Sequence, residues 1–325
     1  MSRSHAFSEV VAGDAATVPI THPQRILFPE DGITKSDLVH YYRNVAHWLL
    51  PYLADRPLTL QCWPDGIAGP SFFETELARG APEWIKTTSQ PAGDRGVHVE
   101  HPLCNDAPSL SWFANLSSIT MHVAMSRVAS FDTPELLLFE LEPFDDCRIK
   151  TLARVALLVR DELATLGLTP LVKTTGGKGL HIVVPLQARY SYGHGRALNE
   201  LLAQRVKRLL PDAVTLERVK SKRPRGTVFF DWTQLGKGKT YVPPFVVRAH
   251  KCAPVSMPLE WTDVEVLWGT QSDRPTHDEL ARWNLRTVPT LLAEKGDVWR
   301  KPFARGQRLE SALARARVLW RTARG

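Results

Sequence analysis

The chain has 325 residues, of which 43% are hydrophobic and 23% charged, and its formal net charge at pH 7 is +7. These values are typical of a globular protein with one large or two modest domains, and they exclude a disordered or fibrous chain. No run of about 18 apolar residues could span a bilayer, and the first residues lack the apolar core of a secretion signal. We therefore expect a cytoplasmic protein that does not enter a membrane.

The N-terminal part predicts a leader followed by a long helix. Residues 1–17 are small and polar, which indicates a flexible leader. Thr34 is a suitable N-cap for a helix over 35–53, where apolar residues recur at helical spacing. Arg25 and Lys35 flank the start of this helix, and the residues alone favour solvated surface charges there.

A strand predicted over 57–63 is followed, after a turn and a loop, by two adjacent aromatic residues. Phe72 and Phe73 cannot share one face of a strand. Either one of them is exposed and able to stack on a base, or both are buried in different layers. Further on, His122 lies in a predicted strand and is either a ligand or a core histidine.

The segment 136–142 is an apolar strand that ends in Glu140 and Glu142. Side chains alternate along a strand, so both carboxylates point to one face. Two like charges this close favour a divalent cation between them, although two solvated glutamates at a strand end also explain the doublet.

Strands and helices alternate through the rest of the chain, which predicts a sheet with helices packed on it. Asp145 or Asp146 is expected to cap the first of these helices. The expected helices cover 147–166, 194–210 and most of 286–324, and the expected strands cover 171–174, 180–185, 227–231 and 242–248. Short elements of unassigned type are expected at 261–268 and 278–285.

A glycine-rich turn, Thr-Thr-Gly-Gly-Lys-Gly-Leu-His, runs from Thr174 to His181. Glycines let a backbone approach an anion closely, while Lys178 adds a charge and Thr175 a hydroxyl. A plain hairpin also explains the glycines, but not the lysine and histidine beside them. The spacing of a P-loop is absent.

Basic charge is clustered in two places, which favours a polyanionic partner. One cluster holds Lys220, Lys222, Arg223 and Arg225, and the other is the tail 300–325. Three acids at strand ends, Glu140, Glu142 and Asp231, complete a set typical of metal-dependent nucleotidyl transfer.

Several ordered motifs together carry a family resemblance. The sequence resembles the polymerase domain of bacterial ligase D, a member of the archaeo-eukaryotic primase superfamily that acts in non-homologous end joining. The likeness extends from about Thr21 to Trp299 and places a single domain at 18–299, with 300–325 as a basic helical tail. The motifs are Arg25-Ile-Leu-Phe-Pro, Thr34-Lys-Ser-Asp, Ser71-Phe-Phe-Glu, Trp112-Phe-Ala-Asn, Thr174 to His181, Phe230-Asp with Gln234, Gly238-Lys-Thr and Val247-Arg-Ala.

The resemblance implies an α/β (α+β) primase-like core, with two sheets flanked by helices around a central cleft. It implies nucleotide addition to DNA ends or gaps with two Mn²⁺ or Mg²⁺ ions, and binding of nucleoside triphosphates and 5′-phosphorylated DNA. By this resemblance Glu140, Glu142 and Asp231 are the catalytic metal ligands, Thr175, Lys178, His181, Gln234 and Arg248 hold the nucleotide, and Arg25, Lys35, Phe72 and Phe73 contact DNA.

One departure bears on activity: the family pattern Asp-Leu-Asp-Pro is replaced by Glu140-Leu-Glu142-Pro. The extra methylene moves each carboxylate by about 1.5 Å, which matters for an ion that requires octahedral geometry at about 2.0 Å. We expect a stand-alone primase-polymerase that works with a Ku-like end binder and a separate ligase. The alternative is a catalytically weakened protein that binds DNA ends or nucleotides.

Overall fold

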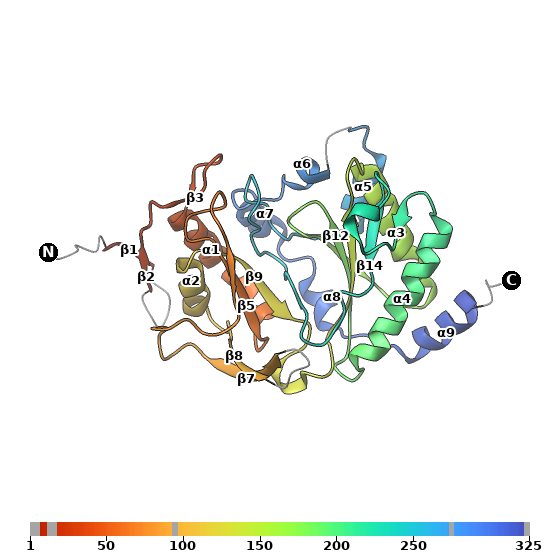
Figure 1. Ribbon diagram of the computed structural model, residues 1–325, viewed down its shortest axis with the longest axis horizontal. Coiled ribbons are helices and arrows are strands. Elements are labelled where there is room, and N and C mark those ends of the chain that lie inside the picture. The colour runs from red at the N-terminus through yellow and green to blue at the C-terminus, as the bar shows by residue number, and fades with distance from the viewer. Residues whose placement is uncertain (1–6, 12–17, 93–96, 273–275, 322–325) are drawn as a thin grey trace. The chain divides into compact units, whose positions relative to one another are not determined.

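The computed structural model describes residues 7–11, 18–92, 97–272 and 276–321, and within these the chain forms a mixed α/β protein (Figure 1). The chain divides into two compact units, each built from separate stretches. The first comprises Met1–Ala129, Thr240–Ser256 and Trp283–Gly296, and the second comprises Ser130–Lys239, Met257–Arg282 and Asp297–Gly325. The predicted α/β class is confirmed, whereas the predicted boundaries at 18 and 299 stay a prediction.

The described residues contain helices α1 to α9 and strands β1 to β16. The helices are α1 Lys35–Leu53, α2 Ala107–Asn115, α3 Ile149–Thr165, α4 Tyr192–Leu209, α5 Trp261–Gly269, α6 Thr276–Leu280, α7 Val288–Lys295, α8 Arg300–Ala304 and α9 Glu310–Arg321. The strands are β1 Phe7–Val11, β2 Val18–Thr21, β3 Ile26–Phe28, β4 Ile33–Thr34, β5 Leu58–Cys62, β6 Phe72–Glu74, β7 Thr87–Ala92, β8 Val97–Pro102, β9 Ser118–Ala124, β10 Leu136–Pro143, β11 Leu171–Thr174, β12 Leu180–Pro185, β13 Val214–Thr215, β14 Val228–Asp231, β15 Thr240–Tyr241 and β16 Pro258–Leu259. None of these helices is long and apolar enough to cross a bilayer.

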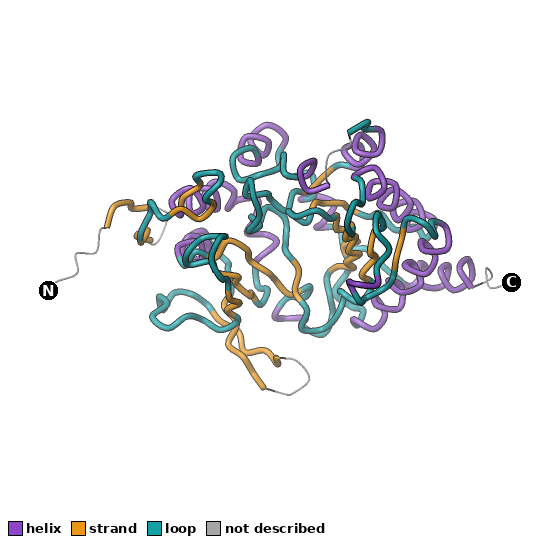
Figure 2. Tube along the Cα trace, turned by 45° about the horizontal axis from the view of Figure 1, so that its top comes forward, coloured by secondary structure: helices purple, strands orange, loops and turns teal. Residues whose placement is uncertain are grey.

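The first unit packs α1 beside a four-stranded sheet of order β15-β9-β5-β6. Thr34 caps α1 as predicted, because its hydroxyl accepts from the Asp37 amide and its own amide donates to the Asp37 carboxylate. The buried face of α1 is tied to the unit by the Tyr42 hydroxyl, which donates to the Ile119 carbonyl at 2.7 Å. The hairpin β7-β8 forms a separate two-stranded sheet of this unit (Figure 2).

Three local predictions differ from the structure. Phe7–Val11, inside the predicted leader, forms strand β1 paired with β2, and the rest of that leader lies outside the described residues. The predicted cap of α3 is wrong, because Arg148 is the N-cap and Asp146 instead binds Arg225. The predicted strand 242–248 is also wrong, because its two prolines lack ladder amides and only a single bridge forms there, between Val247 and Val255.

The second unit is organised around a six-stranded sheet of order β13-β14-β10-β12-β11-β16. All neighbouring strands are antiparallel except β13 and β14. Helices α3 and α4 lie along one face (Figure 1). The closeness of Leu137 to Gly195 of α4 shows that Leu137, Phe139 and Leu141 face this helix layer. Glu140 and Glu142 therefore point to the opposite face.

Strand β14 is shorter than β10, so part of one β10 edge has no strand beside it. Alternate residues of a central strand bond to opposite neighbours. The Phe144 amide donates to the Thr227 carbonyl, so the backbone groups of Phe144 point toward the β14 side. Every second residue back along β10 points the same way, so the Leu138 carbonyl also faces that side, at a position beyond the end of β14. The fully buried Asn199 of α4 donates its side-chain amide to this carbonyl at 2.8 Å. A helix side chain thus replaces the missing strand beside the acidic end of β10.

The Asn199 contact predicts a stability loss that an exposed position on the same helix does not give. Asn199→Ala leaves the buried Leu138 carbonyl without this donor, which should lower the free energy of unfolding by about 1–3 kcal/mol. Gln204→Ala, on the exposed face of α4, is the matched control and should change it by less than about 0.5 kcal/mol. Urea denaturation of both variants measures the difference, and equal midpoints would contradict the role of Asn199.

Candidate active site

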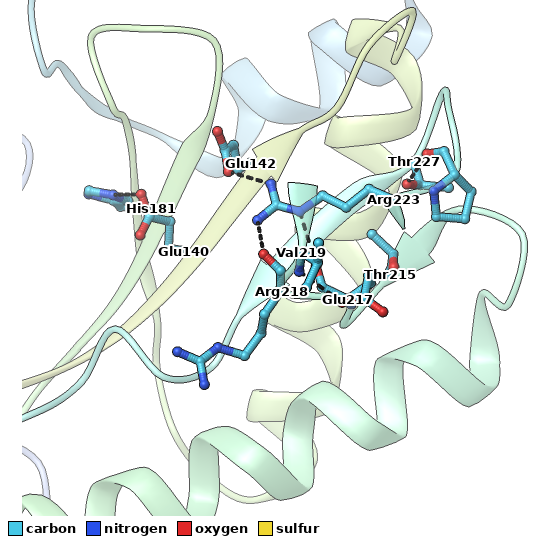
Figure 3. A network of polar contacts seen from close by, with 10 residues as sticks. Glu140, Glu142, His181, Thr215, Glu217, Arg218, Val219, Arg223 and Thr227 are labelled. Atoms are coloured by element: carbon cyan, nitrogen blue, oxygen red, sulfur yellow. Dashed lines mark hydrogen bonds and ion pairs between the residues drawn. The ribbon is translucent and has the colours of Figure 1, made fainter. Parts of the chain in front are cut away.

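Three of the predicted site residues of the second unit lie side by side on adjacent strands. Glu140 of β10 is directly opposite Asp231 of β14 on one side and His181 of β12 on the other. Directly opposite residues share a face and lie about 4.5–5.5 Å apart at Cβ. The His181 Nε2 atom is 3.4 Å from the Glu140 carboxylate (Figure 3). The Asp231 carboxylate accepts hydrogen bonds from the amide and the hydroxyl of Thr233.

Glu142 is held by an arginine from the basic loop. The Arg223 guanidinium donates to the Glu142 carboxylate at 2.9 Å, and its Nε donates to the Glu217 carbonyl at 3.0 Å (Figure 3). The same guanidinium lies over the Phe229 ring, 3.6 Å from the centroid. The Arg223 side chain is only 8% exposed. This arginine is therefore an internal partner of Glu142 rather than an outward charge.

The donor chemistry of the three acids fits a hard divalent cation, because Mg²⁺ and Mn²⁺ prefer carboxylate oxygens. Their arrangement fits less well. In the part of the chain that the structure describes, no three His, Cys, Asp or Glu side chains are grouped as a metal site. The Glu142 carboxylate is paired with Arg223, whereas Glu140 and Asp231 lie directly opposite each other on adjacent strands.

The glycine-rich turn is a compact loop between β11 and β12. Its amides are used inside the loop: those of Gly177 and Gly179 donate to the Thr175 hydroxyl at 3.2 Å. Gly179 also lies against the backbone of β10, because a Cβ there would be 2.5 Å from the Leu141 carbonyl oxygen. The loop is therefore fixed to the strand that carries the acids. Any anion it binds would depend on the half-buried Lys178 more than on these amides.

In the first unit, Lys35 and Arg25 form a basic pair at the start of α1. Lys35 is 4% exposed, and its ammonium donates to the Thr21 hydroxyl at 3.0 Å. The half-buried Arg25 donates to the Pro64 carbonyl at 2.7 Å. Burial, with a further contribution from the charge of Arg25, lowers the pKa of Lys35 to about 8. These residues are thus not the solvated surface charges that the sequence alone favoured.

A second group in the first unit surrounds His122. Both Phe72 and Phe73 are exposed, at 49% and 61%, because β6 is an edge strand. The Phe73 ring meets the His122 ring edge to face at 5.7 Å. Burial and then the nearby charge of Arg248 lower the pKa of His122 to about 3, so the imidazole is neutral. Its Nε2 atom is buried and has no hydrogen-bond partner among the described residues.

Comparison with known proteins decides the family. Residues 34–299 match the family model described as the LigD primase-polymerase domain. The chain belongs to the LigD primase-polymerase family. The solved polymerase domain of Mycobacterium tuberculosis ligase D in complex with DNA is similar in fold, with a TM-score of 0.78, 30% sequence identity, and coverage of 89% of this chain and 99% of that one. This likeness confirms the predicted family and its fold.

Curated LigD relatives are longer than this chain. The multifunctional non-homologous end joining DNA repair protein LigD of M. tuberculosis H37Rv is 35% identical over 256 residues, which are 76% of this chain and 33% of that protein. The multifunctional non-homologous end joining protein LigD of Pseudomonas aeruginosa is 31% identical over 312 residues, which are 94% of this chain and 35% of that protein. The chain thus spans about a third of the length of these relatives.

The structure brings together some predicted LigD-family site residues and separates others. Glu140, Asp231 and His181 form one group in the second unit. Gln234, in the loop after β14, is half-buried. Phe73 and Arg248 both lie near His122 in the first unit. Sequence reasoning missed Arg223 as a partner of Glu142, since nothing in the local pattern separates it from the other basic residues of its loop.

The Arg223 ion pair predicts a measurable effect on metal binding. Arg223→Ala releases Glu142, so Mn²⁺ affinity measured by electron paramagnetic resonance titration should rise by roughly tenfold, because one more carboxylate becomes available. Arg225→Ala is the control, since Arg225 pairs with Asp146 rather than with Glu142 and both side chains of that pair are exposed. Equal Mn²⁺ affinity in the two variants would show that Arg223 does not restrict the site.

Proposed function

We propose that this chain is a DNA-directed nucleotidyltransferase that adds ribonucleotides or deoxynucleotides at DNA ends or gaps during non-homologous end joining. The observation that carries the proposal is the placement of Glu140 beside Asp231 and His181, next to the glycine-rich loop. Membership of the LigD family supports the reaction class, and the DNA in the complex of the M. tuberculosis domain supports the substrate.

Different residues would hold the triphosphate and the metal ions. His181, Lys178 and Thr175 would hold the triphosphate from β12 and the loop, and Gln234 would help to position the nucleotide. Glu140 and Asp231 would hold Mg²⁺ or Mn²⁺, joined by Glu142 once Arg223 releases it. The bound cations would activate the attacking 3′-hydroxyl and stabilise the leaving pyrophosphate.

The first unit would supply the contacts to DNA. The buried ammonium of Lys35 and the guanidinium of Arg25 would bind the 5′-phosphate at a break or gap, since a partly desolvated cation pair attracts a dianion strongly. The exposed rings of Phe72 and Phe73 would stack near the template bases. A Ku-like end binder and a DNA ligase activity are the expected partners.

A second candidate function is DNA-end or nucleotide binding without efficient transfer. The ion pair between Glu142 and Arg223 favours it, because it removes one of the three carboxylates from the metal site. The longer Glu140 and Glu142 side chains favour it too, since misplacement by about 1 Å can cost ~100-fold in rate.

Primer extension separates the two candidates. On a gapped duplex with a 5′-phosphate, with Mn²⁺ or Mg²⁺, the native chain should add nucleotides, and Asp231→Ala should reduce the rate by at least ~100-fold because a metal ligand is lost. Asp161→Ala, an exposed acid of α3, should leave the rate unchanged.

The double variant Glu140→Asp with Glu142→Asp tests the second candidate, binding without efficient transfer. If the native chain adds no nucleotide and this variant does, the protein is a binding protein with a preserved scaffold. If neither adds a nucleotide, the nucleotidyltransferase proposal fails.

The depressed pKa of Lys35 predicts a pH dependence of phosphate recognition. Lys35 loses its proton as the pH rises through about 8, whereas the 5′-phosphate stays a dianion. The preference for 5′-phosphorylated over 5′-hydroxyl DNA should therefore fall between about pH 7 and about pH 9.5, as measured by fluorescence anisotropy. Lys35→Arg, with a guanidinium that keeps its proton, should flatten this profile. A native preference that does not change with pH would contradict the role of Lys35.

A further inference from the structure

A row of four ionisable side chains crosses the six-stranded sheet, one on each of four adjacent strands. Lys173 of β11 is directly opposite His181 of β12, His181 is opposite Glu140 of β10, and Glu140 is opposite Asp231 of β14. Because directly opposite residues share a face, all four side chains point to the same side of the sheet. The row runs from a lysine at one end to two partly exposed carboxylates at the other.

Lys173 is the unexpected member of this row. Its side chain is fully buried, although lysine is rarely buried completely. Taking an ammonium out of water costs several kcal/mol, and an apolar side chain of similar volume would serve packing better. The charge therefore requires an explanation beyond filling the core.

The Lys173 ammonium holds the start of the glycine-rich loop. It donates to the carbonyl of Thr174 at 3.1 Å. The hydroxyl of Thr174 in turn accepts from the Gly176 amide at 3.3 Å and from the Met257 amide at 2.9 Å. The conformation of the first loop residue is thus fixed from both sides, by a buried cation on its carbonyl and by two amides on its hydroxyl.

We propose that Lys173 is a positioning residue for the nucleotide triphosphate. The inference rests on the proposed nucleotidyl transfer function. Lys173 fixes the loop that carries Thr175 and Lys178, and as an ammonium it places a positive charge one strand away from His181 before any nucleotide arrives. In the low-dielectric interior this charge is poorly screened, so it stabilises a triphosphate bound at the glycine-rich loop beside His181. Because it is buried, it acts through the loop and its field, not on the reacting atoms.

The charge of Lys173 should favour nucleotides in proportion to the number of phosphates they carry. If the lysine were purely structural, replacing it would change the affinity for all nucleotides by the same factor, or would change only the stability of the fold. The ratio of AMP to ATP dissociation constants therefore separates the two roles. It can be measured by isothermal titration calorimetry on the full chain, without turnover.

The test compares Lys173→Met, which keeps the length of the side chain and removes the charge, with Lys150→Met, an exposed lysine of α3. Lys173→Met should weaken ATP binding by about tenfold and AMP binding much less, raise KM for the nucleotide in primer extension, and change kcat by less than about threefold. Lys150→Met should match the native chain. Lys173→Arg, which retains a charge, should restore most of the preference for ATP.

The outcomes distinguish this inference from the proposed function. If the native chain binds no ATP, the proposed nucleotide site itself fails. If the native chain binds ATP and Lys173→Met keeps the native AMP to ATP ratio, only the role of Lys173 is overturned. Lys173→Gln is a second neutral variant, and failure of both neutral variants to fold would overturn the inference by showing that the charge serves the fold.

Discussion

The pairing register of β10 is the constraint on which the candidate site depends. Leu137, Phe139 and Leu141 face the helix layer, so a slip by one residue would turn Glu140 and Glu142 into that apolar layer. The same register places Glu140 between Asp231 and His181. Like charges directly opposite each other destabilise a sheet. Burial of the apolar residues of β10 therefore holds Glu140 opposite Asp231 despite the repulsion between the two carboxylates.

Neighbouring side chains offset the repulsion within this cluster in different ways. His181 lies beside Glu140, and Arg223 binds Glu142 while stacking on Phe229. Removing one partner of such a pair leaves the other charge uncompensated, and the arginine competes with any cation for the same carboxylate. The stability of the metal-free protein and its readiness to bind metal are thus opposed at one residue, Glu142, and binding of both substrate and metal would have to overcome the Arg223 bond.

Local patterns in the sequence predicted the elements, and long-range pairing decided the site. Thr34 and the helical spacing after it gave α1 correctly, because capping and periodicity are local. Asp146 was wrong as a cap, because Arg225, far along the chain, binds it instead. The row from Lys173 to Asp231 depends on strand order, which no local pattern encodes. One signal was available in the sequence. A lysine inside the strand Leu171–Thr174 indicates either an edge position or a buried lysine with a structural or functional role.

The two units carry two different groups of proposed phosphate contacts. The basic pair of Lys35 and Arg25 is built wholly within the first unit, and the row that ends in Asp231 wholly within the second. Substitutions in one group should therefore add to substitutions in the other when DNA-end binding and nucleotide binding are measured separately. Non-additive effects would report coupling between the two groups. Recognition of a DNA end by Lys35 and Arg25 and recognition of a nucleotide by the row can therefore be altered one at a time by substitution.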